Sequence, residues 1–183
     1  ILTVGLPLFP HKGLPIYLDH LPRDFIARMP QPADSAEAAR VVRENLAAGA
    51  NATKLFIVTP QAGRVTRMPA DIARAAADES HRRGALVFAH PTDIAGVEAS
   101  LAAGVDILAH TTHGVETPWP AALQQKAISL GMSLIPTLQL MGYELKKENV
   151  PADAAARLIA ASVAHVRSFA AAGGQVLFGT DVG

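Results

Sequence analysis

Two histidines end neighbouring apolar segments in the middle of the chain. Residues 85–89 form a short apolar run, typical of a strand buried on both faces, and His90 follows it. Residues 107–109 form a second such run, which His110 follows, and the residues between have helical spacing up to Gly104. A connection this short makes the two strands parallel, so both imidazoles are expected at the carboxyl edge of one sheet. Although a single histidine at a strand end is often a structural residue, two at the same register favour a metal site.

Two more reactive side chains lie in apolar segments. Lys54 precedes the apolar residues 55–58, and a buried lysine must reach solvent, find a partner or lose its proton. A neutral lysine can react with carbon dioxide to form an anionic carbamate, which can bridge two divalent cations. Asp181 ends the last apolar segment, where a carboxylate can bind a metal and accept a proton from water. The alternatives are a lysine that extends to solvent and an aspartate that caps a helix.

Predicted strands and helices alternate along the chain, which is typical of βα units around a parallel sheet. Strands are predicted near residues 1–9, 53–59, 85–89, 106–109, 132–136 and 175–179. Helices are predicted over residues 36–48, 70–83, 94–104, 121–130 and 152–172. Six strands fit either an open sheet or an eight-stranded barrel that lacks two strands. No glycine-rich nucleotide-binding motif occurs at a strand-to-helix turn, which leaves the nucleotide-binding version of the open sheet unsupported.

The segments 10–32, 60–68, 111–120 and 137–150 are predicted to be loops at the edge that carries the histidines. His113, Tyr143 and Arg64 lie in these segments and are the candidates for substrate contacts, with Tyr17 and Trp119 as further aromatic candidates. A solvated loop side chain is the alternative for each of them.

Composition narrows the class of protein. The 183 residues are enough for one core, and half of them are hydrophobic. Sixteen basic and sixteen acidic residues leave no net charge, which argues against nucleic acid and anionic membranes as partners. No apolar run reaches the length of a membrane span, and cysteine is absent, which excludes disulfides and thiolate metal sites. We therefore expect a soluble protein, and the cytoplasm is the favoured compartment.

The order of a lysine strand, an FAH strand, an LAH strand and a GTD strand resembles the metal-dependent amidohydrolase superfamily. The imidazolonepropionase and prolidase-like branch is the most similar. In that family the barrel strands supply a His-x-His pair, a carboxylated lysine, two single histidines and an aspartate. Lys54, His90, His110 and Asp181 match the last four of these. No His-x-His occurs, so we expect residues 1–183 to be a partial (β/α)8 TIM-barrel domain without the first strands and the family's β-sandwich.

The resemblance implies a zinc-dependent hydrolase that cleaves a C–N bond in an amide, a cyclic amide or a peptide. His90 and His110 would hold the outer of two zinc ions, carboxylated Lys54 would bridge the pair, and Asp181 would bind metal and transfer a proton. The partner would be a small-molecule or peptide substrate, and an exposed barrel edge would favour association between copies. The alternatives are a mononuclear hydrolase or deaminase with an unmodified lysine, and a non-catalytic barrel that has lost its metals.

Overall fold

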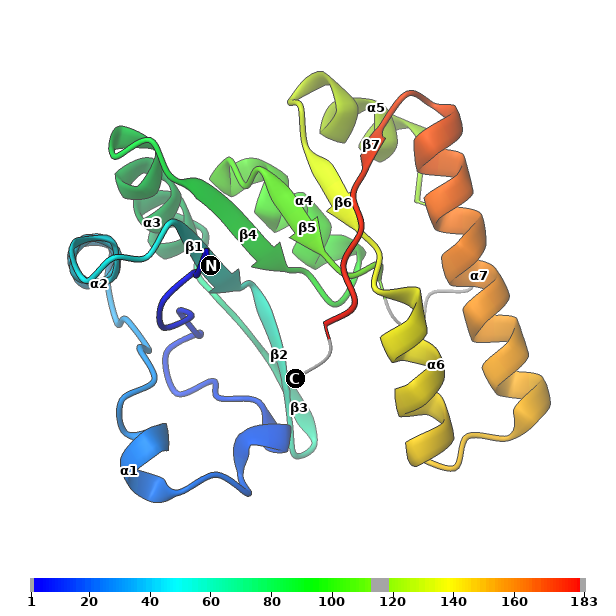
Figure 1. The fold of residues 1–183 in the computed structure, drawn as a ribbon, viewed down its shortest axis with the longest axis horizontal. Helices are drawn as coiled ribbons and strands as arrows, with labels where there is room; N and C mark the ends of the chain where they lie inside the picture. The colour runs from blue at the N-terminus through cyan, green and yellow to red at the C-terminus, as the bar shows by residue number, and fades with distance from the viewer. Residues whose placement is uncertain (1, 113–118, 182–183) are drawn as a thin grey trace.

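The structure is a computed structural model, and it describes residues 2–112 and 119–181. Its centre is a five-stranded sheet in the order β1-β4-β5-β6-β7, in which all neighbouring strands are parallel (Figure 1). The strands are β1 (Ala52–Phe56), β4 (Leu86–His90), β5 (Ile107–Ala109), β6 (Ser133–Ile135) and β7 (Gln175–Val176). A separate antiparallel hairpin consists of β2 (Val58–Gln61) and β3 (Arg64–Arg67).

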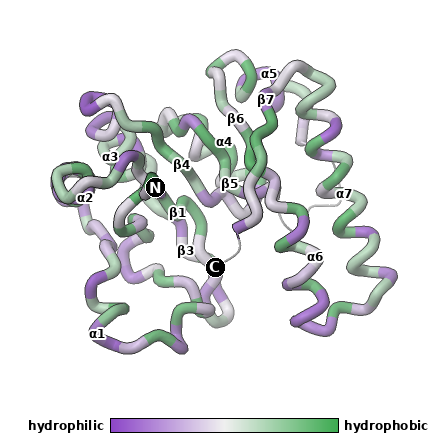
Figure 2. Tube along the Cα trace, in the orientation of Figure 1, coloured by the Kyte–Doolittle hydropathy of each residue, from purple (hydrophilic) through white to green (hydrophobic). Residues whose placement is uncertain are grey.

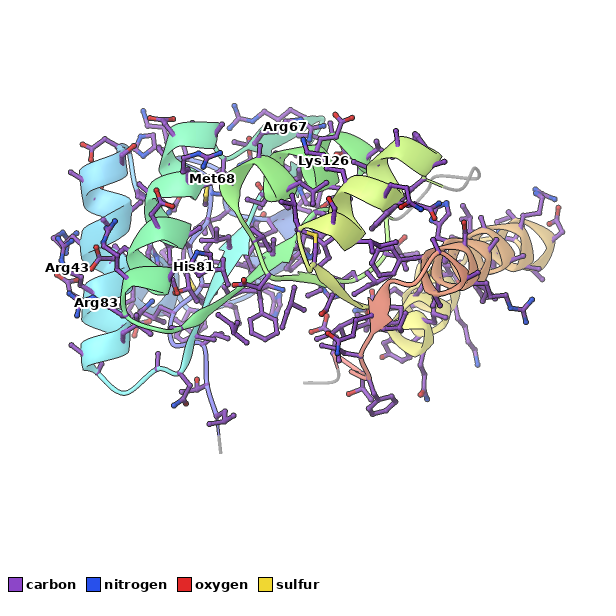
Figure 3. All side chains as sticks on the ribbon, turned by 90° about the horizontal axis from the view of Figure 1, so that it is seen from above. Arg43, Arg67, Met68, His81, Arg83 and Lys126 are labelled. Atoms are coloured by element: carbon purple, nitrogen blue, oxygen red, sulfur yellow. The ribbon has the colours of Figure 1, made fainter. Side chains whose placement is uncertain are left out.

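Helices follow the strands in the order expected for repeated βα units. They are η1 (Ile16–Leu18), α1 (Arg23–Ile26), α2 (Ser35–Ala47), α3 (Ala70–Arg82), α4 (Ile94–Ala103), α5 (Ala121–Ser129), α6 (Leu138–Lys147) and α7 (Ala152–Ala171). Helices α2 to α5 lie on one side of the sheet, and α7 lies beside β7 (Figures 1 and 3). None of the helices formed by the described residues combines the length and the hydrophobicity that a membrane span requires.

The helix side of the sheet is a continuous apolar layer. Leu55, Ala89, Leu108 and Leu134 are register partners across four strands, and none of them is more than 1% exposed. Figure 2 shows the hydrophobic stretch of β4 within this sheet. Burial of a leucine side chain contributes about 1.5–3 kcal/mol, and a one-residue slip would expose the whole row. Because side chains alternate along a strand, this layer forces Lys54 onto the opposite face.

The helix boundaries follow local signals that the sequence carries. Asp34 accepts a hydrogen bond from the Glu37 N–H at the start of α2, and Glu37 accepts one from the Ala33 N–H in return. Gly104 ends α4 with a φ of 81°, which a residue with a side chain adopts only at a cost. The predicted helices are therefore confirmed to within one or two residues.

Several predictions need correction. The predicted loop 10–32 contains η1 and α1, and the predicted strand 53–59 ends at Phe56, after which Val58 and Thr59 belong to β2. The segment 60–68 is not a loop but forms most of the β2–β3 hairpin. The hairpin tolerates Pro60 because both strands of a two-stranded sheet are edge strands. The segment 137–150 is not a loop either, because it contains helix α6. The predicted first strand reduces to one parallel bridge between Leu8 and Leu55, since Pro7 and Pro10 cannot donate ladder hydrogen bonds.

Candidate functional site

Four chemically active side chains belong to the strands of the parallel sheet or to the residues that follow them. His90 is the last residue of β4, His110 follows β5, Asp181 follows β7, and Lys54 lies within β1. Phe56 at the end of β1 is the register partner of His90. The parallel register therefore brings the ends of these strands to one edge, as the sequence predicts.

His110 and Asp181 form the closest pair at this edge. His110 Nε2 lies 3.5 Å from Asp181 Oδ2, with the imidazole side chain 6% exposed and the carboxylate 53% exposed. The His90 ring lies against the His110 ring with their centroids 4.8 Å apart at an interplanar angle of 71°. His110 thus contacts Asp181 on one side and the His90 ring on another, and the carboxylate of Asp181 remains accessible to solvent.

Two phenylalanines extend this cluster along the edge. The Phe9 and Phe56 rings stack with centroids 4.5 Å apart, and Phe56 stacks on His90 with centroids 4.9 Å apart. The sequence analysis missed both rings. Phe56 could have been found, because it lies two residues after Lys54 and must share its face of the strand.

Lys54 lies on the face of β1 opposite the apolar, helix-covered face, with its Nζ 5.5 Å from the centroid of the Phe56 ring. Burial lowers the pKa of Lys54 to about 8, and the negative charge of Asp181 opposes this shift without cancelling it. The surroundings of Lys54 therefore combine two of the fates that the sequence left open: an aromatic partner, and a pKa low enough for about a tenth of the amine to be neutral at pH 7.

The N-terminal segment contributes Tyr17 from η1. Burial, together with the negative charge of Asp181, raises the pKa of Tyr17 to about 12. The phenol therefore keeps its proton over the physiological range and can only act as a neutral hydrogen-bonding group.

Left-handed backbone is concentrated after the strands of the sheet. Thr92, His110, Thr137 and Asp181 have φ values of 62°, 81°, 45° and 55°, and they follow β4, β5, β6 and β7. Residues other than glycine adopt this conformation at a cost of about 1–3 kcal/mol, and such residues cluster at functional sites. The edge with the histidines is therefore also the strained edge of the sheet.

The three predicted substrate residues have different positions. Arg64 is in β3, where its guanidinium lies 3.4 Å from the Lys12 carbonyl oxygen, beside a 280 Å³ pocket that Gln61 also lines. Tyr143 lies on α6 and is 63% exposed. His113 is outside the described residues. Trp119 is buried at 4% exposure, so it is a core residue and not a loop contact.

The donor types at the edge fit a divalent cation. Imidazole nitrogens with a carboxylate oxygen suit zinc, and a half-exposed carboxylate leaves room for water. Within residues 2–112 and 119–181, however, no three His, Cys, Asp or Glu side chains converge closely enough to hold a metal ion. The described residues thus supply suitable ligand types without a preassembled three-ligand cluster.

Several solved structures that superpose on this chain are described as hydrolases. An Xaa-Pro dipeptidase with bound methionine superposes with a TM-score of 0.74 at 17% identity. The ochratoxinase of A. niger gives 0.75 at 20% identity, and a putative prolidase from Bifidobacterium longum gives 0.69 at 26% identity. The matches cover 97%, 98% and 96% of this chain. No protein-family model and no curated protein matches the sequence.

The chain spans less than half of each of these structures, namely 46%, 46% and 44% of their lengths. It therefore has the fold of an incomplete (β/α)8 barrel of the amidohydrolase type, as predicted. The predicted resemblance to the amidohydrolase superfamily and its prolidase-like members is confirmed at the level of the fold.

Proposed function

We propose that the protein is a metal-dependent hydrolase that cleaves a C–N bond in an amide, a cyclic amide or a peptide. The observation that carries this proposal is the meeting of His110 with Asp181 beside His90. It lies at the carboxyl edge of parallel strands, where barrels of this kind place their reacting groups. The structural neighbours named as dipeptidase and prolidase favour the same class of reaction.

His90, His110 and Asp181 would hold the cation, and their donor types match zinc best. Zinc, when bound there, would supply a water acidic enough to yield hydroxide near neutral pH. The neutral amine of Lys54 would react with carbon dioxide, lose a proton and supply the resulting carbamate oxygens as further metal ligands. The pKa of Lys54 near 8 favours this reaction, because about a tenth of such an amine is neutral at pH 7.

The chain's own side chains would divide the remaining tasks. A carboxylate oxygen of Asp181 accepts the proton of the attacking water and delivers it to the leaving nitrogen, since it is the exposed base of the cluster. Phe9 and Phe56 cover the side of the site next to Lys54 with apolar rings and reduce its hydration. Tyr17 keeps its phenolic proton and would donate a hydrogen bond to substrate.

A mononuclear site with an ordinary lysine is the second candidate. The position of Lys54 Nζ over the Phe56 ring favours it, because a charged ammonium is attracted to an aromatic face. Incubation with ¹³C-bicarbonate separates the two candidates. A carbamate carbon signal that disappears in Lys54→Met indicates the bridged site, and its absence from the zinc-loaded protein indicates the mononuclear one.

Metal content of the purified full-length protein tests the proposal, together with hydrolysis of Xaa-Pro dipeptides and N-acyl amino acids. We expect zinc in the wild type and a reduced amount in His90→Asn and in His110→Asn. The matched control is His81→Asn, because His81 lies on α3 and pairs with Asp106 at 2.9 Å. A full-length protein that binds no divalent metal and hydrolyses none of these substrates would contradict the proposal.

A further inference from the structure

The side of the His110 ring that faces away from Asp181 has its own neighbour. His110 Nδ1 lies 2.8 Å from Thr137 Oγ1, and both residues are at most 5% exposed. Nε2 is the nitrogen that faces Asp181. The Thr137 hydroxyl and the Asp181 carboxylate therefore lie at opposite ring nitrogens of one imidazole.

The position of Thr137 follows from the pairing of β5 with β6. Ala109 is the register partner of Ile135, and the His110 N–H donates to the Ile135 carbonyl at 2.7 Å. Pro136 then leads to Thr137, so the same strand pair fixes the backbone of the histidine and that of the threonine. Their hydrogen bond thus joins two points that the sheet already holds in register.

Two local features of Thr137 are energetically unfavourable, which indicates that its side chain has a role outside the helix start. It is the N-cap residue of α6, where threonine usually accepts a hydrogen bond from the helix, yet it makes no side-chain cap. Its φ of 45° is left-handed, which is costly for a β-branched residue. The helix start therefore lacks its cap and the backbone is strained, while the hydroxyl bonds the imidazole.

We propose that Thr137 is a positioning residue that holds the His110 imidazole with Nε2 toward the metal. This inference rests on the proposed function, in which His110 is a ligand. A hydroxyl can donate to an unprotonated Nδ1 and accept from a protonated one. The bond therefore persists when Nε2 exchanges a proton for a cation. Partners of this kind typically change metal affinity 10- to 100-fold when they are removed.

The test measures two quantities for each variant of the full-length protein. One is the zinc dissociation constant, and the other is the ¹⁵N spectrum of the His110 ring in the zinc-free protein. Thr137→Val removes the hydroxyl at constant shape, and Thr137→Ser retains it. Thr137→Gly removes the hydroxyl and also relieves the positive φ, so a purely structural role predicts no loss of zinc affinity. Thr111→Val is the matched control. Thr111 is buried, and its hydroxyl has no hydrogen-bond partner among the described residues.

We expect zinc affinity to fall about 10- to 100-fold in Thr137→Val and Thr137→Gly, and to stay close to wild type in the other two variants. The Nδ1 resonance should shift in the same two variants. Unchanged affinity and an unchanged Nδ1 resonance in Thr137→Gly would overturn the inference.

Failure of the proposed function has a different signature. In that case the wild type binds no zinc, and the ring spectrum of the zinc-free protein alone decides whether Thr137 orients His110. An Nδ1 resonance that shifts in Thr137→Gly and returns in Thr137→Ser supports positioning, and one that shifts in neither excludes it.

Discussion

His110 and Asp181 come from β-strand ends far apart in the chain, yet the imidazole Nε2 and the carboxylate Oδ2 lie 3.5 Å apart. The backbone of His110 is held by its N–H bond to the Ile135 carbonyl and the buried ring by the Thr137 hydroxyl, whereas the carboxylate is half exposed. The pair thus combines an imidazole held in one orientation with a carboxylate that is accessible to water.

Replacement of the acidic partner tests the role of this pair in catalysis. Asp181→Asn keeps the shape of the side chain but removes the base, so we expect kcat to fall about 10²- to 10⁴-fold. Steady-state hydrolysis by the full-length protein measures the change. Asp19→Asn is the control, because it makes the same substitution at the C-cap of η1 and not after a strand of the sheet. A variant that retains wild-type kcat would show that Asp181 transfers no proton.

Gly96 is expected to be essential for the segment that follows His90. A Cβ at Gly96 would lie 1.8 Å from the Pro91 carbonyl oxygen, so Gly96→Ala should lower the free energy of unfolding by about 1–3 kcal/mol. Gly142 lies inside α6, and its nearest neighbour to a Cβ is Ile159 Cδ1 at 3.9 Å. Gly142→Ala should therefore raise the free energy of unfolding by about 0.5–1 kcal/mol.

Urea unfolding of both glycine variants, followed by the fluorescence of the single tryptophan, gives the comparison. Equal effects of the two substitutions would mean that the approach of α4 to Pro91 is not close in solution.

A buried polar network connects α7 to the segment after His110. The Trp119 indole N–H donates to Thr112 Oγ1 at 3.1 Å, and Thr112 Oγ1 lies 3.4 Å from His165 Nδ1. Thr112→Val deprives the buried indole of its acceptor, and we expect a loss of about 1–3 kcal/mol in the free energy of unfolding. Thermal unfolding beside Thr111→Val provides the measurement, and a loss no larger than that of the control would refute the prediction.

The Glu79 carboxylate is 7% exposed and accepts hydrogen bonds from Arg82 and Arg83, with Arg43 at 3.6 Å. The hydrogen bonds from Arg82 and then Arg83 lower the pKa of Glu79 to about 2. Because the pKa is lower in the folded than in the unfolded state, the stabilisation is complete above pH 4.5 and is lost as the pH falls to about 2. Glu79→Gln should therefore be less stable than wild type at pH 7, and the difference should shrink below pH 4.5.

Urea unfolding between pH 7 and pH 3 checks this dependence. Glu44→Gln is the control, because Glu44 pairs with Arg40 on an exposed helix face and such pairs contribute little. A pH-independent difference between wild type and Glu79→Gln would rule out the carboxylate as its source.

Local patterns predicted most of the secondary structure correctly. The apolar runs that end in His90 and His110 and the cap at Gly104 needed only neighbouring residues to be recognised. Helix α6 was missed because Gly142 weakens its pattern, and its long-range contacts with α7 compensate for that weakness. The β2–β3 hairpin was missed because Pro60 argues against a strand, although an edge position accepts it.

The sequence by itself determined which side chains lie at the carboxyl edge, because strand alternation and parallel crossovers depend on local spacing alone. Only the tertiary structure decided which atoms meet there. The contacts of His110 with Thr137 and Asp181, and that of Phe56 with His90, depend on register, ring rotamers and left-handed backbone after each strand. These features are set by packing between segments distant in the chain, so no local pattern encodes them.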